Sequence, residues 1–141
     1  MNRVLIVGIT LALGTSACAA HAQTSSAQNE ISTAHAHALM AQSATSVAMA
    51  HTHLHHVINC LVGPGGNGFE AAAGDPCKGQ GKGAIADASN DHALHAKLES
   101  ALTDAQAGLK SESLAAVQQD AGKAASGLQD AASPKASSSS W

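Results

Sequence analysis

Aromatic side chains are almost missing from this sequence. Its 141 residues include one Phe, one Trp and no Tyr. Because bulky side chains bury the most apolar area, a folded core must instead come from close packing of small residues, here mainly Ala. The shortage also leaves a porphyrin little apolar surface to rest against, and no C-x-x-C-H motif is present. Haem is therefore a weak alternative for this chain.

Positive charge is also scarce. The chain has seven Lys and Arg residues against ten Asp and Glu residues, a formal net charge of −3 with neutral histidines. This balance offers no basic patch for nucleic acid. The sequence also lacks a G-x-S-x-G elbow, a P-loop and a C-x-x-C redox pair. We therefore predict that the protein is not an enzyme, since nothing in the sequence identifies a substrate.

The segment 1–22 has the order of a secretory signal peptide. Arg3 supplies a basic start, residues 4–13 form a short apolar run, and an A-x-A cleavage site ends at Ala22. The run is too short to span a bilayer as an anchor. Cleavage would leave six basic and ten acidic residues, a net charge of −4, in a periplasmic or secreted chain. Lipidation of Cys18 is an alternative, although the residue three positions earlier is not the usual branched apolar one.

Two cysteines, Cys60 and Cys77, remain after the predicted leader. An even count in an oxidising compartment favours a disulfide. The bridge would close the glycine-rich segment 62–88, which is longer than most loops, and would contribute about 3 kcal/mol in the chain-entropy model. We therefore expect a disulfide-closed loop tied back to the helix that precedes it.

The segment 28–62 has the composition of one long helix. It contains neither Pro nor Gly before its end. From Thr33 to Leu61, side chains recur at steps of three and four, the spacing of a seam that faces a partner helix. Such a helix, rich in Ser and Thr, would be marginal alone, so it must pack against something.

Two further helices are expected after the loop. The first would start with Ser89 or Asn90 as N-cap and run to Leu109, and the second would start after Ser111 or Ser113. The short connection predicts an antiparallel helical hairpin. The expected fold is thus all-α: a long N-terminal helix, a disulfide-closed loop and a hairpin, forming a bundle of three or four helices in a domain over residues 23–132. The tail, residues 133–141, is expected to be disordered.

Histidines are the most informative residues. Eight follow the predicted leader: His35, His37, His51, His53, His55, His56, His92 and His95. Imidazole is the commonest metal ligand in proteins and suits Cu, Ni and Zn. His51 and His55 stand at i and i+4 of a helix, a spacing that lets two imidazoles chelate one ion. His53 and His56, at i and i+3, form a second pair that points elsewhere.

An inter-helix metal site follows if the long helix and the next one pack antiparallel. Its candidate ligands are His51, His55, His92 and His95, since His55 and His95 would lie at similar depths, about 9 Å from the shared end. His37 would lie about 21 Å from His51 along one helix, so it would form a separate site if it binds metal. Met40 and Met49 hint at Cu(I), although methionines in an apolar seam more often only pack.

These features resemble the small His-rich metal-binding proteins of the bacterial periplasm. The leader, the histidines from His51 to His56, the pair His92 and His95, and the Ala/Leu hairpin after Leu94 carry the resemblance. It implies an exported helical protein that binds several divalent metals. The chain departs from that pattern because no histidine follows His95 and because cysteines flank a glycine-rich loop.

The sequence therefore predicts a periplasmic protein that binds Cu, Ni or Zn for buffering or delivery. The alternative is a non-enzymatic structural or interaction protein of the envelope, in which the seam contacts a second copy or another envelope protein and the histidines bind no metal. A metal enzyme would need a substrate cleft and an open coordination position.

Overall fold

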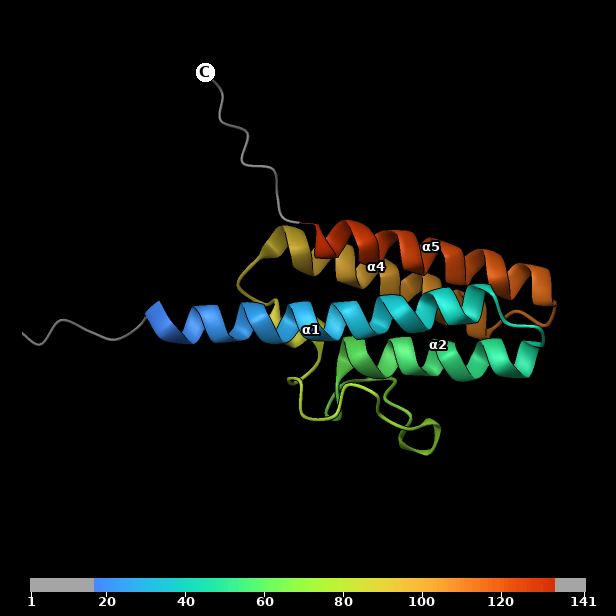
Figure 1. The fold of residues 1–141 in the computed structure, drawn as a ribbon, viewed down its shortest axis with the longest axis horizontal. Helices are drawn as coiled ribbons and strands as arrows, with labels where there is room; N and C mark the ends of the chain where they lie inside the picture. Colours follow the sequence, from blue (N-terminus) through green and yellow to red (C-terminus); the bar gives the residue numbers. More distant parts are fainter. Residues whose placement is uncertain (1–16, 134–141) are drawn as a thin grey trace, which may run out of the picture.

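The computed structural model describes residues 17–133, with side chains from Ser26 on, and this part of the chain contains helices and no strand (Figure 1). The elements are α1 (Ala17–Gln42), α2 (Val47–Val62), the 3-10 turn η1 (Ala71–Ala73), α3 (Ala84–Asp87), α4 (His92–Leu109) and α5 (Leu114–Ala132). The all-α prediction is confirmed. Most of the predicted leader, residues 1–16, and the tail 134–141 lie outside the described residues, so both predictions stand untested.

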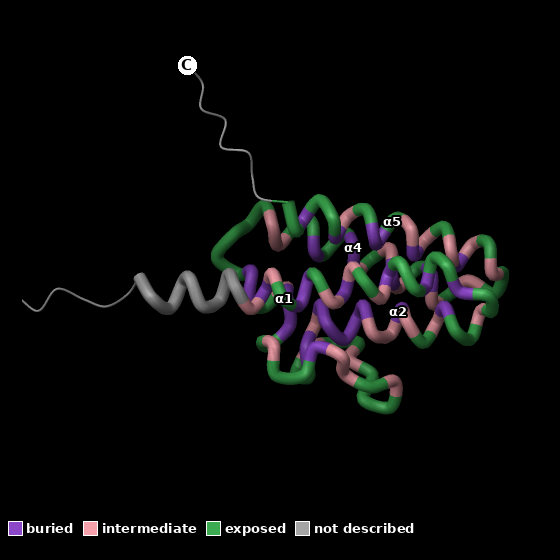
Figure 2. The backbone as a smooth tube through the Cα atoms, viewed as in Figure 1, coloured by how far each residue is buried: buried purple, intermediate pink, exposed green. Residues whose placement is uncertain are grey.

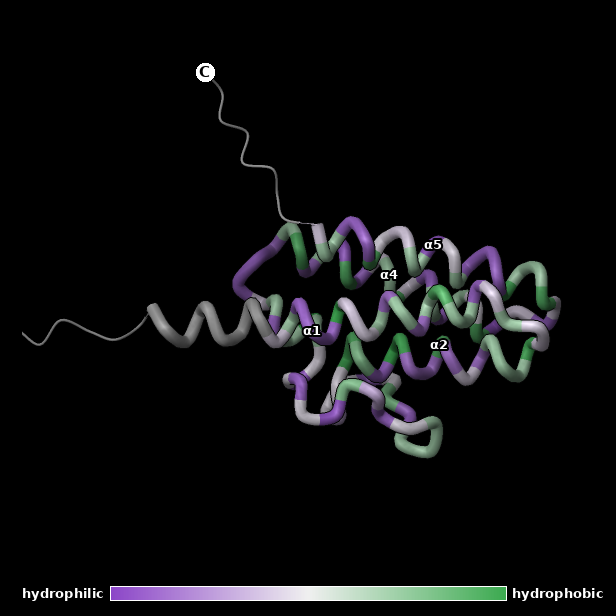
Figure 3. Tube along the Cα trace, in the orientation of Figure 1, coloured by the Kyte–Doolittle hydropathy of each residue, from purple (hydrophilic) through white to green (hydrophobic). Residues whose placement is uncertain are grey.

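Four longer helices form the body of the molecule. α1 packs against α2 and α5, α4 packs against α5 and α2, and α2 and α5 also contact each other. Figure 1 shows the four helices running side by side, with the loop that follows α2 on the outer side of α2 and the chain then passing α1 on its way to α4. No described helix combines the length and the apolar character needed to cross a membrane, and Figure 3 shows hydrophilic residues interrupting the hydrophobic ones along every helix.

The prediction of one long helix over residues 28–62 is wrong. The chain leaves the helix after Gln42 and starts α2 at Val47, where the Ser46 hydroxyl caps the new helix by accepting from the backbone N–H of Met49 at 3.2 Å. Folding back lets α1 and α2 bury their alanine faces, and Ala38 and Ala50 are both fully buried. The burial of these two faces against each other and against α4 and α5 outweighs the few helical hydrogen bonds lost at the turn.

Small residues fill the core, as the shortage of aromatic residues requires. Figure 2 shows buried positions along the inward side of each helix. Among the fully buried side chains the largest apolar ones are Ile31, Leu54, Leu61, Leu98, Leu128, Val57 and Val117, and alanines occupy most other core positions. Gly108 illustrates the close packing, because a Cβ there would lie 2.6 Å from the Cδ1 of Leu54.

The hairpin of α4 and α5 begins with two side-chain caps. The carboxylate of Asp91 accepts from the N–H groups of Ala93 and Leu94 at 3.1 and 3.0 Å, and Ser113 caps α5. The expected caps Ser89 and Asn90 belong instead to the turn that follows α3. Capping at Asp91 moves the start of α4 one or two residues later than expected, because an N-cap side chain accepts from the N–H groups two and three residues after it.

The segment between α2 and α4 is held at three points. The predicted disulfide between Cys60 and Cys77 is present. One residue earlier, the fully buried Asn59 donates to the carbonyls of Glu70 and Gly74 at 2.8 and 2.7 Å and accepts from the Glu70 N–H at 2.8 Å.

The third point joins the two ends of the loop. At Gly83 the φ angle is +110°, and a Cβ would lie 2.6 Å from the nitrogen of Gly63. Only glycine allows this approach, so the segment closes into a compact cover beside α2.

Candidate metal centre

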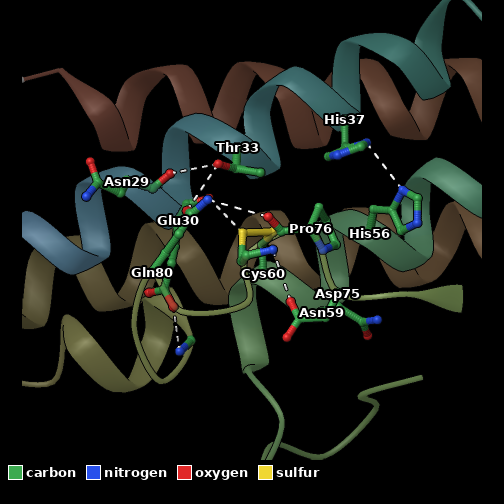
Figure 4. Close-up of a disulfide and its surroundings, with 12 residues drawn as sticks. Asn29, Glu30, Thr33, His37, His56, Asn59, Cys60, Asp75, Pro76 and Gln80 are labelled. Carbon is green, nitrogen blue, oxygen red and sulfur yellow. Dashed lines mark hydrogen bonds between the residues drawn. A yellow bond between two sulfur atoms is a disulfide. The ribbon is translucent and has the colours of Figure 1, made fainter. Parts of the chain in front are cut away.

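Three histidines converge between α1 and α2. The Nδ1 atom of His37 on α1 lies 3.2 Å from the Nδ1 of His53 and 3.3 Å from the Nδ1 of His56, both on α2. One ring nitrogen from each of the three lies within 4.8 Å of the other two, which is close enough for one metal ion. Figure 4 shows His37 and His56 facing each other across the gap between the helices. We call these three residues the histidine triad.

The turn between α1 and α2 brings the triad together. His37 lies five residues before the end of α1 at Gln42, and His53 lies six residues after the start of α2 at Val47. In antiparallel helices joined by a short turn, residues at equal distances from that turn lie opposite each other. His56 follows one helical turn after His53 and so reaches the same gap.

The glycine-rich segment fixes the orientation of His56. The Nε2 atom of His56 lies 2.8 Å from the carbonyl oxygen of Ala73 in η1. Because a carbonyl only accepts, Nε2 carries the proton of this hydrogen bond and the neutral ring keeps its lone pair on Nδ1. That lone pair faces His37. A hydrogen bond on the far nitrogen is the usual way in which proteins orient a metal-binding imidazole.

The surroundings of His37 and His53 disfavour the protonated form of both rings. Burial, with the neighbouring His56 and His53, lowers the pKa of His37 from 6.5 to about 4. Burial, with His56, also lowers the pKa of His53. A protonated imidazole would repel a second protonated imidazole beside it. Burial and this repulsion therefore both oppose protonation of these rings. Neutral imidazole is the form that binds a metal ion.

The two separations that join His37 to His53 and His56 fit tetrahedral coordination. With Zn–N distances of about 2.0–2.1 Å, two ligands at the tetrahedral angle lie about 3.3–3.4 Å apart. The two Nδ1 separations of 3.2 and 3.3 Å agree with this spacing. An ion at the centre would replace the hydrogen bonds between the rings with bonds to the metal, and a fourth position would remain for water or another ligand.

The four histidines of the predicted inter-helix site lie elsewhere. His51 contacts the turn between α4 and α5, with its Nε2 3.1 Å from the carbonyl of Ser111. The Nδ1 of His55 is buried and has no hydrogen-bond partner. His92 is exposed at the start of α4, and His95 is half-buried one turn later. Within the described part of the chain, the histidine triad is the group of three or more candidate ligands close enough for one ion.

His37 is the triad residue that the sequence separated from the others. On one continuous helix it cannot reach His53 or His56, and the expectation of a separate site for His37 followed from that helix. The available signal was the run Ser43-Ala44-Thr45-Ser46, which contains three residues that favour N-cap positions. Read as a turn, this run predicts the meeting of His37 and His53.

A buried acidic pair lies at the other end of the same loop. Glu30 on α1 is 1% exposed, and its Oε1 accepts from the N–H of Gly83 at 2.8 Å, whereas its Oε2 has no partner. Asp87 of α3 is also buried and accepts from the N–H of Lys82 at 3.1 Å. Burial and the nearby charges of Asp87 and Asp75 raise the pKa of Glu30 to about 7, although the Gly83 hydrogen bond opposes this. Glu30 is shown beside the disulfide in Figure 4.

Comparison with known proteins gives no further guide to the site: no family model, no curated protein and no solved structure matches the chain.

Proposed function

We propose that this protein binds a transition metal ion, Cu, Ni or Zn, through the imidazoles of His37, His53 and His56. The observation that carries the proposal is the convergence of three ring nitrogens from two helices, with Nδ1 separations of 3.2 and 3.3 Å. Isolated pairs of histidines at helical spacing are common on protein surfaces. Three imidazoles that face a common centre match the ligand number of known three-histidine zinc sites.

Two further observations support a metal role over a packing role. The Ala73 carbonyl holds His56 with its Nδ1 lone pair turned toward the other two rings. The pKa values of His37 and His53 are both lowered, so these rings are unprotonated at neutral pH. Three imidazoles placed together only to fill space would have no need of ring nitrogens that face one point.

We propose buffering or delivery of the metal rather than catalysis. The three rings are half-buried, so an ion bound to them stays accessible from solvent. Three protein ligands leave a tetrahedral ion one open position, and a metal acceptor can use that position to begin removing the ion. Export by the leader at residues 1–22 would place this exchange in the periplasm, where the partners would be metal ions and their acceptors.

The test is a metal titration of the chelator-treated protein with Cu(II), Ni(II) and Zn(II), followed by calorimetry. The triad variant H37Q/H53Q/H56Q keeps side chains of similar polarity and removes all three ligands. The matched control, H35Q/H92Q/H95Q, removes the same number of histidines and leaves the triad intact. We expect one saturable site in the wild type and in the control. In the triad variant we expect the affinity for the metal to fall by a factor of about 100 or more.

The opposite pattern would reject the proposal. If the triad variant binds as tightly as the wild type while the control variant loses binding, the metal lies at the other histidines. If all three proteins bind equally weakly, the histidines bind no metal specifically. Far-ultraviolet circular dichroism of each variant checks that the helices remain.

A further inference from the structure

The two methionines of the described residues are exposed instead of packed. Met40 is 47% exposed, Met49 is 48% exposed and Leu39 is 45% exposed, whereas the other leucines and valines of the described residues are buried or partly buried. A methionine that serves packing lies inside the core, where its flexible chain fills gaps. These two contribute little to the core, so the predicted seam does not account for them.

Both methionines stand one helical turn from the triad, on the side of the turn between α1 and α2. Met40 follows His37 by three residues on α1, a rise of about 4.5 Å, and Met49 precedes His53 by four residues on α2, a rise of about 6 Å. The two helices are antiparallel neighbours. Met40 and Met49 therefore lie at the same level along the pair of helices, next to the triad.

The opposite side of the triad is covered. There the loop carbonyl of Ala73 bonds His56, and Asn59 holds the loop against α2 one turn further along. The loop therefore contacts the triad on the side away from the turn, and the two exposed methionines stand on the side of the turn.

We propose that Met40 and Met49 form a soft-metal entrance site that binds a monovalent ion such as Cu(I) or Ag(I) and passes it to the histidine triad. Thioethers are soft ligands that select Cu(I) over Zn(II) and Ni(II). Transfer exchanges sulfur ligands for nitrogen ligands and changes no oxidation state. The binding step stands on the methionines alone, whereas the transfer step rests on the proposed function of the triad.

The binding step is tested with Ag(I), which is not redox-active under these conditions, in the full chain carrying ¹³C-labelled methionine methyl groups. The experiment uses the variant H37Q/H53Q/H56Q, so that binding of Ag(I) to the triad histidines cannot hide or mimic binding to the methionines. We expect the Met40 and Met49 methyl signals to shift saturably with Ag(I) and to ignore Zn(II). The control is M40L/M49L with Leu39→Met in the same background. It keeps one exposed thioether, because Leu39 is 45% exposed, but moves it around the helix.

Comparing the protein that carries Met40 and Met49 with the Leu39→Met control distinguishes a two-methionine binding site from a single exposed thioether. Binding at least tenfold tighter than in the Leu39→Met control supports the entrance site. Equal affinity in both proteins, or no methyl shift at all, overturns it.

The transfer step is tested by the rate at which the protein with an intact triad takes Ag(I) from a soluble thioether complex. The comparison is the wild type against M40L/M49L, in which leucine keeps the apolar volume and removes sulfur. We expect uptake to slow at least tenfold in the variant while the uptake of Zn(II) is unchanged. An unchanged rate for Ag(I) overturns the transfer step, and a wild type that takes up neither ion contradicts the proposed function of the triad instead.

Discussion

Replacing Glu30 by Gln should remove one part of the dependence of stability on pH. Glu30 is almost fully buried, and its pKa rises from 4.5 to about 7 in the folded protein. Between these two values the folded state binds a proton that the unfolded state has released. The stabilisation by this proton is therefore complete below pH 4.5 and is lost as the pH rises to about 7.

The magnitude follows from the same values. Each tenfold change in proton affinity corresponds to about 1.4 kcal/mol, so the rise from 4.5 to about 7 is worth on the order of 3 kcal/mol over this range. His37 acts in the opposite direction, because its pKa falls to about 4 and the folded protein gains stability as the pH rises toward 6.5. The wild-type profile is the sum of both effects. Only the difference between two variants isolates Glu30.

The assay is urea unfolding, followed by circular dichroism, at pH values from 4.5 to 8. Gln at position 30 keeps an oxygen that can accept from the N–H of Gly83, but it does not titrate. The free energy of unfolding of the wild type minus that of E30Q should fall by about 3 kcal/mol between pH 4.5 and pH 7.5. The matched control is Glu99→Gln on the exposed side of α4, which makes the same change of side chain away from the core.

A flat difference for E30Q would refute the reasoning. It would mean that Glu30 titrates near its ordinary value in the folded protein, so that burial beside Asp87 costs the charged form little. A difference that rises with pH would mean that the hydrogen bond from Gly83 outweighs burial.

Three further predictions concern the loop. Asn59→Ala removes three hydrogen bonds to the backbone of the loop and should lower the free energy of unfolding by about 2–3 kcal/mol in urea titrations; a loss below 0.5 kcal/mol would contradict an anchoring role. Gly83→Ala forces a side chain into backbone at φ +110° and should cost more than about 2 kcal/mol in thermal unfolding, whereas Gly65→Ala, with nothing within 4 Å, should cost less than about 0.5 kcal/mol. Replacing Cys60 and Cys77 by Ser should lower the free energy of unfolding by about 3 kcal/mol. It should also weaken Zn(II) binding about 10-fold to 100-fold, because the loop then no longer holds the Ala73 carbonyl that orients His56. Unchanged affinity in calorimetry would show that the loop plays no part in the site.

Local chemistry determined much of this structure in advance. Gly63 ends α2 where the sequence predicted a helix end, Ser113 caps α5 as one of two expected caps, and Cys60 pairs with Cys77. Each of these depends on properties of a few neighbouring residues, such as the positive φ of glycine, the capping oxygen of serine or an even number of cysteines. The shortage of aromatic residues likewise required the alanine-rich core that the helices form.

The meeting of the three histidines was decided only by the tertiary structure. Ser43 to Ser46 suit either the interior of a weak helix or a turn, because the helix propensities of Ser, Thr and Ala differ by well under 1 kcal/mol per residue. The packing of α1 against α2 and α5 settles the choice in favour of the turn. Glu30 is a similar case, since its burial depends on a loop more than fifty residues away in sequence. The sequence by itself determined that the chain is helical and rich in metal-binding side chains, and the long-range packing of its small residues decided which of those side chains lie together.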